Sequence, residues 1–346
     1  MFRSRIFSFA SRDMAIDLGT SNTLIYLRGS GIVLDEPSVV AIETIDGIQK
    51  VIGVGTDAKS MIGKTPRNIT TTRPLRDGVI ADLNVAELML QHFIATALGG
   101  QSLLPRWPEI VMCLPSGATS VERRAIRDAA SNAGASKVYL LPEPMAAAIG
   151  AGMPVTEAVG GMIVDIGGGT TEVAVISLGG LAYSNSVRVG GDKMDEAIVS
   201  MVRRNHGLQI GEATAERIKQ DIGSVVKSAE SQEVTVRVGG RDAVTGVPRK
   251  IVVQQSDIAD AIAEPVKRIV DAVLLCLENT PPELAADMID QGITLSGGGA
   301  LLSGIDHALC KATGLKVSIA DNPLTCVVAG AGRTLEDARY KSVLML

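Results

Sequence analysis

Two short stretches of the chain carry nearly the same pattern of chemically useful residues. Residues 15–27 read AIDLGTSNTLIYL, and residues 163–175 read IVDIGGGTTEVAV. In each stretch an aspartate follows an apolar residue, a glycine comes two positions later, and small hydroxyl residues precede an apolar run. Glycine lets the N–H groups of a tight turn approach an anion, and Ser or Thr hydroxyls add donors. Each pattern therefore predicts a β-hairpin whose turn can hold a phosphate.

The aspartate before each turn predicts a metal-binding role. Asp17 and Asp165 would stand at the end of the first strand of each hairpin, close to the phosphate. Because Mg²⁺ prefers carboxylate oxygens and keeps several waters, each aspartate could hold the ion directly or through water. A single hairpin of this kind is a common structural turn. Two copies in one chain instead indicate a duplicated fold whose halves clamp a polyphosphate between them.

A third glycine-rich stretch, residues 293–305, reads ITLSGGGALLSGI. An apolar strand is expected to lead into Gly297, Gly298 and Gly299, and a helix is expected to begin at Ala300. Backbone at such a turn can lie flat against a nucleoside, and the N-terminus of a helix favours anions. This stretch therefore predicts a third contact with a nucleotide.

The elements that position these turns are those of an α/β protein. Apolar runs of strand length alternate with segments of helical periodicity. Strands are expected at residues 14–18, 23–28, 38–43, 50–54, 109–114, 137–141, 161–166, 171–177, 233–238, 249–254, 292–296 and 315–319, and helices at 84–98, 120–133, 145–151, 193–206, 214–228, 257–278, 300–312 and 325–336.

Several element boundaries have a chemical signal. Thr119 and Glu122 are spaced as a capping box, and Asp192 is expected to cap the helix that ends at His206. Gly207 and Gly314 are expected to end two helices in the left-handed conformation. Residues 233–254 predict a hairpin whose loop carries Gly239, Gly240 and Gly246.

Length and composition limit the class of protein. The chain has 346 residues, which suits two domains or one bilobed unit, and aromatic residues make up only 3%, so the core must be aliphatic. The net charge of −5 gives no basic footprint and argues against a nucleic-acid partner. The four cysteines show no metal spacing and are expected to be buried free thiols, as suits a reducing compartment.

Taken together, these stretches resemble the ATPase superfamily of actins, heat-shock chaperones and sugar kinases, and within it the MreB family of bacterial actins. The resemblance is carried by DLGTSNTLIY, LDEPSVVA, RPLRDGVIAD, LPSGATSVERRAI, EPMAAAIGAG, DIGGGTTEVAV, RVGGDKMDEAI, TAERIKQDIG and LSGGGALLSG. It covers nearly the whole chain after residue 12. It implies an actin-like fold of two similar lobes, each with a mixed-sheet, ribonuclease-H-like core and a smaller inserted subdomain, with ATP between the lobes.

The resemblance also implies a division of the chain. A basic amphipathic segment at 1–12 precedes subdomain IA at 13–35, 78–147 and 319–346, with subdomain IB inserted at 36–77. Subdomain IIA takes 148–184 and 249–318, with subdomain IIB inserted at 185–248. We call the two parts lobe I (IA and IB) and lobe II (IIA and IIB).

By resemblance, Asp17 and Asp165 flank Mg²⁺, through its waters, and the turns hold the phosphates of ATP. The TAERIKQ stretch is assigned to ribose and adenine, although Glu216 and Lys219 by themselves are an ordinary solvated pair at i, i+3. The implied nucleotide-binding residues are Gly19, Thr20, Ser21, Asn22, Gly167, Gly168, Gly169, Thr170, Glu216, Arg217, Ile218, Lys219, Gly297, Gly298, Gly299 and Ala300.

Glu143 is the candidate for the residue that orients the attacking water. Pro144 disfavours helix at Glu143 and suits the first turn of a following helix, so Glu143 is expected at a strand-to-helix corner. In actin-like ATPases this corner lies near the γ-phosphate, and a carboxylate there can act as acceptor for the water. The resemblance makes Thr170 its partner across the cleft. A plain helix-capping acid is the alternative.

Two segments carry large apolar groups where polar ones would be expected. Phe2, Ile6 and Phe9 share one side of a short basic helix, and Leu103, Leu104 and Trp107 stand in a loop beside an arginine. Both patterns suit contact with a membrane surface, and the resemblance implies a membrane-contacting loop here. The alternatives are a disordered tail and a loop folded over the core. No apolar run reaches the ~20 residues that a membrane span needs.

The leading hypothesis is a cytoskeletal ATPase with slow hydrolysis that forms filaments on the inner face of the cytoplasmic membrane and organises cell-wall synthesis to set rod shape. The resemblance implies as partners other copies of the chain, in paired protofilaments, and cell-wall elongation proteins such as MreC, MreD and RodZ. The alternative is a soluble small-molecule kinase of the superfamily, which needs an aspartate base and a polar sugar pocket. A chaperone would need a substrate-binding domain after the ATPase core, and the chain ends soon after AGAGRTLEDA.

Overall fold

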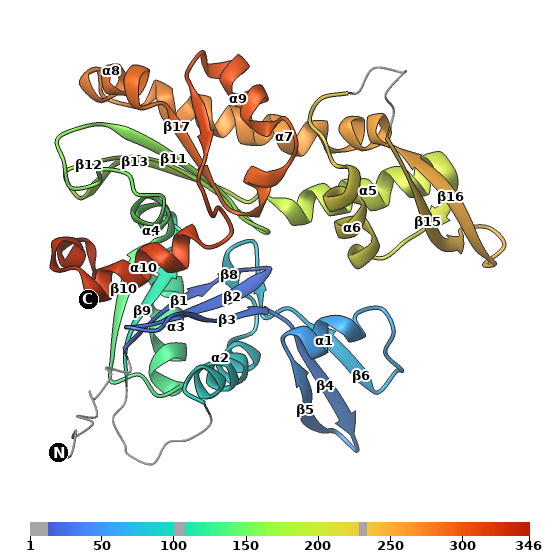
Figure 1. The fold of residues 1–346 in the computed structure, drawn as a ribbon. Coiled ribbons are helices and arrows are strands. Elements are labelled where there is room, and N and C mark those ends of the chain that lie inside the picture. Colours follow the sequence, from blue (N-terminus) through green and yellow to red (C-terminus); the bar gives the residue numbers. More distant parts are fainter. Residues whose placement is uncertain (1–12, 100–107, 228–233) are drawn as a thin grey trace, which may run out of the picture.

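The structure is a computed structural model that describes residues 13–99, 108–227 and 234–346. Two lobes face each other across a cleft (Figure 1). The sheet of lobe I contains β1 (Met14–Leu18), β2 (Asn22–Leu27), β3 (Gly31–Pro37), β9 (Glu109–Leu114) and β10 (Lys137–Pro142). The sheet of lobe II contains β11 (Gly161–Ile166), β12 (Thr171–Ser177), β13 (Gly180–Val187), β17 (Ile293–Ser296) and β18 (Val317–Ile319).

The two sheets have the same topology. Lobe I has the strand order β10-β9-β1-β2-β3, and lobe II has the order β18-β17-β11-β12-β13. In each, the hairpin strands and the strand after them pair antiparallel, and the other two strands pair parallel. The duplicated α/β fold predicted from the repeated sequence pattern is confirmed.

Successive side chains of each central strand point to opposite faces of its sheet, and this explains how the layers are held together. Met14 and Ile16 of β1 point into a core with α2 (Leu83–Ala97) and α3 (Ser120–Asn132), whereas Ala15 points to the opposite face. In lobe II, Met162 and Val164 of β11 point into a core with α5 (Gly191–His206), α6 (Glu212–Ile222), α7 (Gln255–Glu278), α8 (Pro282–Gln291) and α9 (Ile305–Thr313). Apart from the partly buried Asp17, both strands are buried on both faces, as is typical of strands that are apolar at almost every position.

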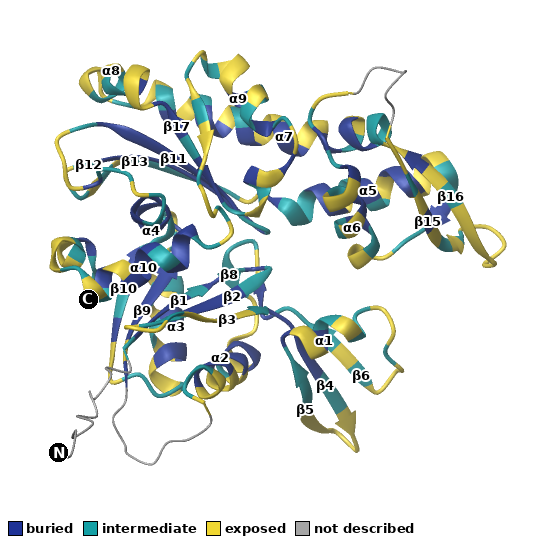
Figure 2. Cartoon of the chain, in the orientation of Figure 1, coloured by how far each residue is buried: buried dark blue, intermediate teal, exposed yellow. Residues whose placement is uncertain are grey.

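A central layer joins the lobes. Ala15 and Ile163, one from each sheet, belong to one core with α4 (Glu143–Gly150) and α10 (Cys326–Glu336). The two helices approach very closely, since a Cβ at Gly330 would lie 1.9 Å from the carbonyl oxygen of Ala146. Figure 2 shows α4 and α10 as buried elements between the two sheets.

Smaller units extend from each lobe. In lobe I, β4 (Val40–Ile45), β5 (Ile48–Val54) and β6 (Ile69–Thr72) form a sheet beside α1 (Thr56–Met61), and β7 (Leu75–Arg76) pairs with β8 (Val79–Ile80). In lobe II, β14 (Leu208–Gln209), β15 (Thr235–Asp242) and β16 (Pro248–Gln254) form a sheet. Short 3₁₀ turns occupy Gly298–Leu301 and Ala338–Val343.

Most of the chemical signals at element ends are confirmed. Thr119 and Glu122 form the reciprocal capping box of α3, and Gly207 (φ 61°) and Gly314 (φ 72°) end α5 and α9 in the left-handed conformation. Asp192 was the wrong cap for α5, because the helix begins at Gly191, two residues earlier than expected, and its N-cap is Gly190.

Three further expectations are corrected. The helix expected at 300–312 begins only at Ile305, because Gly298–Leu301 form a 3₁₀ turn. In the hairpin of β15 and β16, Gly239 and Gly240 lie within the strand and only Gly246 lies in the loop. Cys310 is exposed, whereas the other three cysteines are buried free thiols as predicted.

Candidate functional site

The two lobes enclose a cleft of about 1440 Å³. This is larger than the several hundred Å³ usual for small-ligand pockets, so it can hold a nucleotide with its ion and waters. Most of the residues predicted as nucleotide, metal or catalytic contacts line it: Asp17, Gly19, Thr20, Ser21, Asn22, Glu143, Asp165, Gly167, Gly168, Gly169, Thr170, Glu216, Lys219, Gly297, Gly298 and Gly299.

Three of the predicted nucleotide-binding residues do not line the cleft. Ile218 and Ala300 are fully buried in the core of lobe II, and Arg217 is exposed. Ile218 lies on α6 between Glu216 and Lys219, which do line the cleft. The helix therefore contributes one face to the cavity, and Glu216 and Lys219 share that face because they are three residues apart.

The two glycine turns are built alike and lie against each other. Gly19 N–H donates to Asn22 O at 3.1 Å, and Gly167 N–H donates to Thr170 O at 2.9 Å. A Cβ on Gly168 would lie 2.0 Å from Ser21 Oγ, and one on Gly169 would lie 2.7 Å from Thr20 Oγ1. The lobe II turn needs glycines because the lobe I turn, which carries side chains, packs directly on it.

A third turn meets the two hairpins. Gly78 lies between β7 and β8 with a φ of 77°, and its N–H donates to Thr20 Oγ1 at 3.2 Å. A Cβ there would lie 2.8 Å from Thr170 Cγ2, across the cleft. This turn was not among the site residues predicted from the sequence. Its Asp77-Gly78 dipeptide is a recognisable hairpin-turn signal.

Acidic side chains gather at the inner end of the cleft. Burial, with the charges of Asp165 and Asp35, raises the pKa of Asp17 to about 7. Burial also raises the pKa of Asp165 to about 6, although the Ser296 hydroxyl opposes this. The pKa of Glu143 is raised well above its ordinary value by burial and by the charges of Glu172, Asp17 and Asp165. Such mutual repulsion makes this end of the cleft attractive to a cation.

The side chains present fit a magnesium ion. Among the described residues, buried Asp165 Oδ1 has no hydrogen-bond partner, so it can accept from an ion's water or bind the ion itself. Within the described residues no group of three or more His, Cys, Asp or Glu side chains is arranged to hold a metal by itself. Mg²⁺ typically takes one or two carboxylates and completes its shell with phosphate oxygens and waters. Bound here, it would neutralise part of the negative charge.

Glu143 lies at the strand-to-helix corner that the proline predicted, but the helix begins earlier than expected and includes Glu143 itself. β10 ends at Pro142, α4 begins at Glu143, and Pro144 lies in the first turn of the helix. The carboxylate belongs to lobe I, and Thr170 lines the cleft from lobe II. The structure thus brings the two predicted catalytic residues to opposite walls of one cavity.

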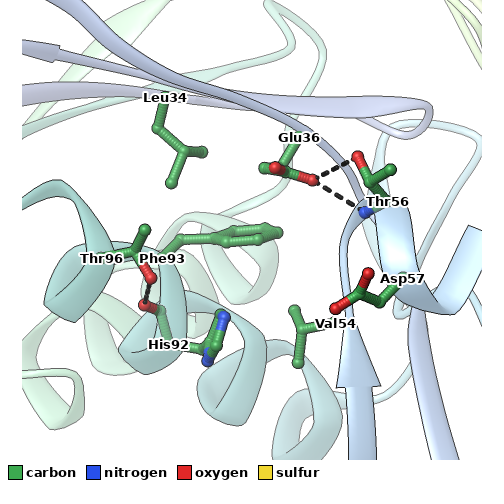
Figure 3. A pocket seen from close by; sticks show the side chains of 8 residues that line it. All are labelled: Leu34, Glu36, Val54, Thr56, Asp57, His92, Phe93 and Thr96. Carbon is green, nitrogen blue, oxygen red and sulfur yellow. Dashed lines mark hydrogen bonds between the residues drawn. The ribbon is translucent and has the colours of Figure 1, made fainter.

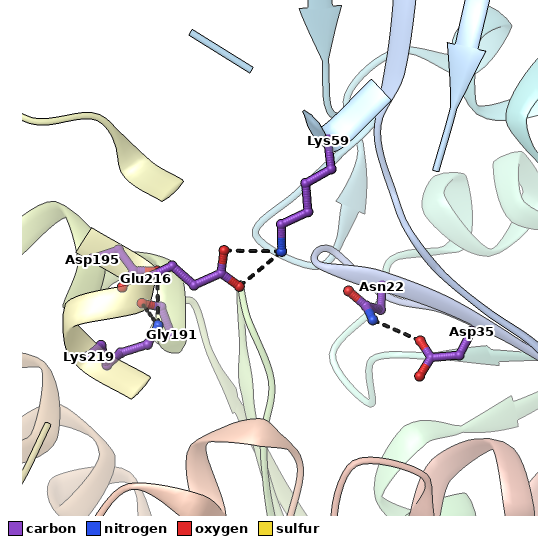
Figure 4. A network of polar contacts seen from close by, with 7 residues as sticks. All are labelled: Asn22, Asp35, Lys59, Gly191, Asp195, Glu216 and Lys219. Atoms are coloured by element: carbon purple, nitrogen blue, oxygen red, sulfur yellow. Dashed lines mark hydrogen bonds and ion pairs between the residues drawn. The ribbon is translucent and has the colours of Figure 1, made fainter. Parts of the chain in front are cut away.

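At the mouth of the cleft the small units of the two lobes are joined by an ion pair (Figure 4). Lys59 Nζ of α1 lies 3.1 Å from both carboxylate oxygens of Glu216 on α6. On the same helix, Lys219 Nζ lies 2.9 Å from Asp195 Oδ2 and donates to Gly191 O at 2.9 Å. Lys59 was not predicted as a site residue, because nothing in its local sequence distinguishes it from other surface lysines.

A second, smaller cavity of about 140 Å³ lies in lobe I between α1 and α2 (Figure 3). One of its two lining acids, Glu36, accepts from both the N–H and the hydroxyl of Thr56 at 2.7 Å. This carboxylate holds the N-terminus of α1, so the cavity is a gap at the base of the small sheet.

The six residues predicted to contact a membrane, Phe2, Ile6, Phe9, Leu103, Leu104 and Trp107, lie outside the described residues. Across the described ranges, no helix is both long enough and apolar enough to span a membrane.

Two matching sheets, joined by a central layer and closing paired glycine turns around a cleft, define an actin-like protein. Comparison with known proteins then narrows the class. A family model described as MreB/Mbl protein matches residues 11–343. The chain therefore belongs to the MreB/Mbl family.

The sequences of curated relatives agree with membership of this family. The chain is 56% identical to the cell shape-determining protein MreB of Escherichia coli (strain K12) over 328 residues, 94% of each chain. It is 48% identical to the cell shape-determining protein Mbl of Bacillus subtilis (strain 168), over 94% of this chain and 96% of the relative. Membership of this family supports the cytoskeletal hypothesis over the small-molecule kinase.

The fold also matches solved structures. MreB 5 of Spiroplasma citri bound to AMPPNP has a TM-score of 0.88 at 36% identity, over 95% of this chain and 97% of that one. A MamK double helical filament has a TM-score of 0.77 at 22% identity, over 94% of this chain and 99% of that one, which supports the fold alone.

Proposed function

We propose that this protein is a cell-shape-determining cytoskeletal ATPase. It binds Mg·ATP between its lobes, polymerises with ATP, hydrolyses it slowly to regulate assembly, and organises cell-wall synthesis to set rod shape. The observation that carries the proposal is the pair of matching turns packed on each other beside the cluster of acids. The names of the relatives and the nucleotide in the Spiroplasma citri structure support it.

Each part of the cleft has a proposed role. Asp17 and Asp165 hold Mg²⁺, mainly through its waters, and the N–H groups and hydroxyls of the two turns bind the phosphates. Glu143, with Thr170 opposite, orients the attacking water. Glu216, Lys219 and the Gly297–Gly299 turn contact the nucleoside. The division into four subdomains, with the boundaries expected from sequence, belongs to the same proposal.

The filament is proposed to lie on the inner face of the cytoplasmic membrane. Burying a Leu or Phe side chain contributes roughly 1.5–3 kcal/mol, so one copy inserting a few such groups binds weakly once immobilisation is subtracted. A filament displays the same groups many times, so binding becomes tight only on assembly. The proposed partners are other copies of the chain in paired protofilaments and cell-wall elongation proteins such as MreC, MreD and RodZ.

The test is sedimentation of purified protein with and without ATP and anionic vesicles, with electron microscopy of the pellets. Filaments that require ATP support the cytoskeletal function, and a protein that stays in the supernatant in every condition contradicts it. A variant lacking residues 2–10 and carrying Leu103→Ser, Leu104→Ser and Trp107→Ser should bind ATP and no longer pellet with vesicles. If it pellets with vesicles as the wild type does, the membrane assignment fails.

A further inference from the structure

One buried acid has no part in the function proposed so far. Glu172 of β12 is only 1% exposed, and it pairs directly with Asp165 across the hairpin. Removing a carboxylate from water carries a large free-energy cost unless its oxygens are hydrogen-bonded. A carboxylate at this position therefore calls for a physical reason.

The hairpin of lobe I shows that the fold itself does not require an acid there. In the matching register Asp17 pairs with Leu24, a buried apolar residue of β2. The two hairpins have the same strands, the same turn closure and the same neighbours in their sheets. Glu172 must therefore serve something that lobe II does and lobe I does not.

The hydrogen bonds of Glu172 connect the two lobes. Its Oε2 accepts from Ser116 N–H at 2.9 Å and from Ser116 Oγ at 2.6 Å, while its Oε1 accepts from the Ser186 hydroxyl. Ser186 lies on β13 of the same lobe, whereas Ser116 lies in lobe I, in the loop between β9 and α3. The neighbouring residue, Gly117, comes so close to Ser186 that a Cβ would lie 3.3 Å from Ser186 Cβ.

The two residues of this contact lie close in the fold to the proposed catalytic pair, Glu172 near Thr170 and Ser116 near Glu143. Glu172 stands two residues after Thr170 on the lobe II hairpin. Ser116 follows the end of β9, whose last residue, Leu114, pairs with Pro142, the residue before Glu143. Moving Ser116 away from Glu172 would therefore separate Thr170 from Glu143.

We propose that Glu172 is a positioning residue that ties the lobe II phosphate hairpin to the Ser116 loop of lobe I, and so holds Thr170 opposite Glu143 while nucleotide is bound. The proposal rests on the ATP hydrolysis proposed above for its effect on turnover. The tie between the lobes also acts on nucleotide release, which does not depend on hydrolysis.

The experiment measures two rates on the full chain: release of a fluorescent ADP by stopped flow, and steady-state phosphate release with kcat and KM determined separately. Glu172→Ala and Ser116→Ala should speed ADP release by about 3–10-fold. Both should lower kcat, with Glu172→Ala lowering it by about 10-fold or more, because misplacement of catalytic groups acts mainly on kcat. Glu172→Gln keeps the side-chain volume and covers the case in which Glu172→Ala fails to fold.

Matched variants distinguish loss of the Glu172–Ser116 contact from a general loss of structure. Ser184→Ala alters the same strand as Ser186 without touching Glu172 and should release ADP at the wild-type rate. The double variant Glu172→Ala/Ser116→Ala should be no worse than Glu172→Ala alone, since both changes break one connection.

Wild-type ADP release from both Glu172→Gln and Ser116→Ala would overturn the proposal, as would losses that add in the double variant. If the wild type binds ATP without turnover while the variants still release ADP faster, the hydrolysis proposal fails and the tie stands.

Discussion

The two hairpins at the centre of the molecule share their topology and differ in their polar groups. Across three neighbouring strands, lobe I places Asp17, Leu24 and Asp35 side by side. In the same register, lobe II places Asp165, Glu172 and Ser186. The first acid is common to both, and the second acid differs in position by one strand. Asp35 accepts a hydrogen bond at 2.8 Å from Asn22 of its own lobe, whereas Glu172 accepts from Ser116 of the other lobe.

The turns of the hairpins differ in a complementary way. Lobe I uses Thr20 and Ser21, and lobe II uses glycines, Gly169 and Gly168, at the positions that pack against those two side chains. A duplicated unit has thus become two unequal halves of one site. In the proposed site, lobe I supplies side-chain donors and the strand-to-helix corner with Glu143, and lobe II supplies backbone N–H groups and the acid that connects the lobes.

The largest expected effect comes from removing Glu143, the acid at the strand-to-helix corner of lobe I. Glu143→Ala should keep ATP binding and lower phosphate release by on the order of 10²-fold or more, because the water loses its acceptor. The exposed Glu157, changed to Ala, is the control. Turnover of Glu143→Ala equal to that of the control would refute the assignment.

Comparison of the shared aspartates tests whether the two hairpins contribute equally to metal binding. Asp165→Ala and Asp17→Ala should each weaken Mg·ATP binding by roughly 10–100-fold and ATP alone much less, because the lost contact is with the ion and its waters. Asp165→Ala should have the larger effect, because its buried Oδ1 has no hydrogen-bond partner among the described residues. Calorimetric titrations with and without Mg²⁺ measure this, and equal losses in both conditions would show that the aspartates have another role.

The same aspartates predict a pH dependence of stability. The pKa of Asp17 is raised from 3.8 to about 7, so between these values the folded protein holds a proton that the unfolded chain has lost. Stability of the nucleotide-free protein should therefore fall as pH rises from about 4 to 7. Thermal unfolding at pH 5.5 and 8 should differ by roughly a few degrees in the wild type and by less in Asp17→Asn. An unchanged difference in the variant would contradict the assignment to Asp17.

The smallest effect is expected at the mouth of the cleft. The Lys59–Glu216 pair is about one-third exposed, so it contributes roughly 0.2–1 kcal/mol to holding the small units together. Lys59→Ala should speed nucleotide release by up to about 5-fold, and Lys59→Arg should stay near the wild type. Lys64→Ala is the control, because this lysine lies on the same unit and its ammonium donates to the carbonyl of Ser60. Equal release rates for Lys59→Ala and Lys64→Ala would mean that the pair does not close the cleft.

The sequence was most informative where chemistry and geometry are local. An aspartate, a glycine turn and two apolar runs specify a hairpin within about a dozen residues, so both hairpins, with the turn and the aspartate of each, could be predicted. Pro144 predicted the corner at Glu143, and Gly207 predicted a helix end, for the same reason: each acts on its own backbone. The predicted start of a helix was wrong where a glycine-rich turn favoured 3₁₀ geometry over α-helix, as before Ile305.

By itself, then, the sequence determined the repeated unit and its acids, because backbone conformation and burial follow from short-range pattern. Only the tertiary structure decided which residues of one lobe meet which residues of the other. Ser116 reaches Glu172 from 56 positions away, and Lys59 reaches Glu216 from 157 positions away. No local pattern encodes either contact, because each depends on how the central layer of α4 and α10 sets the two lobes against each other.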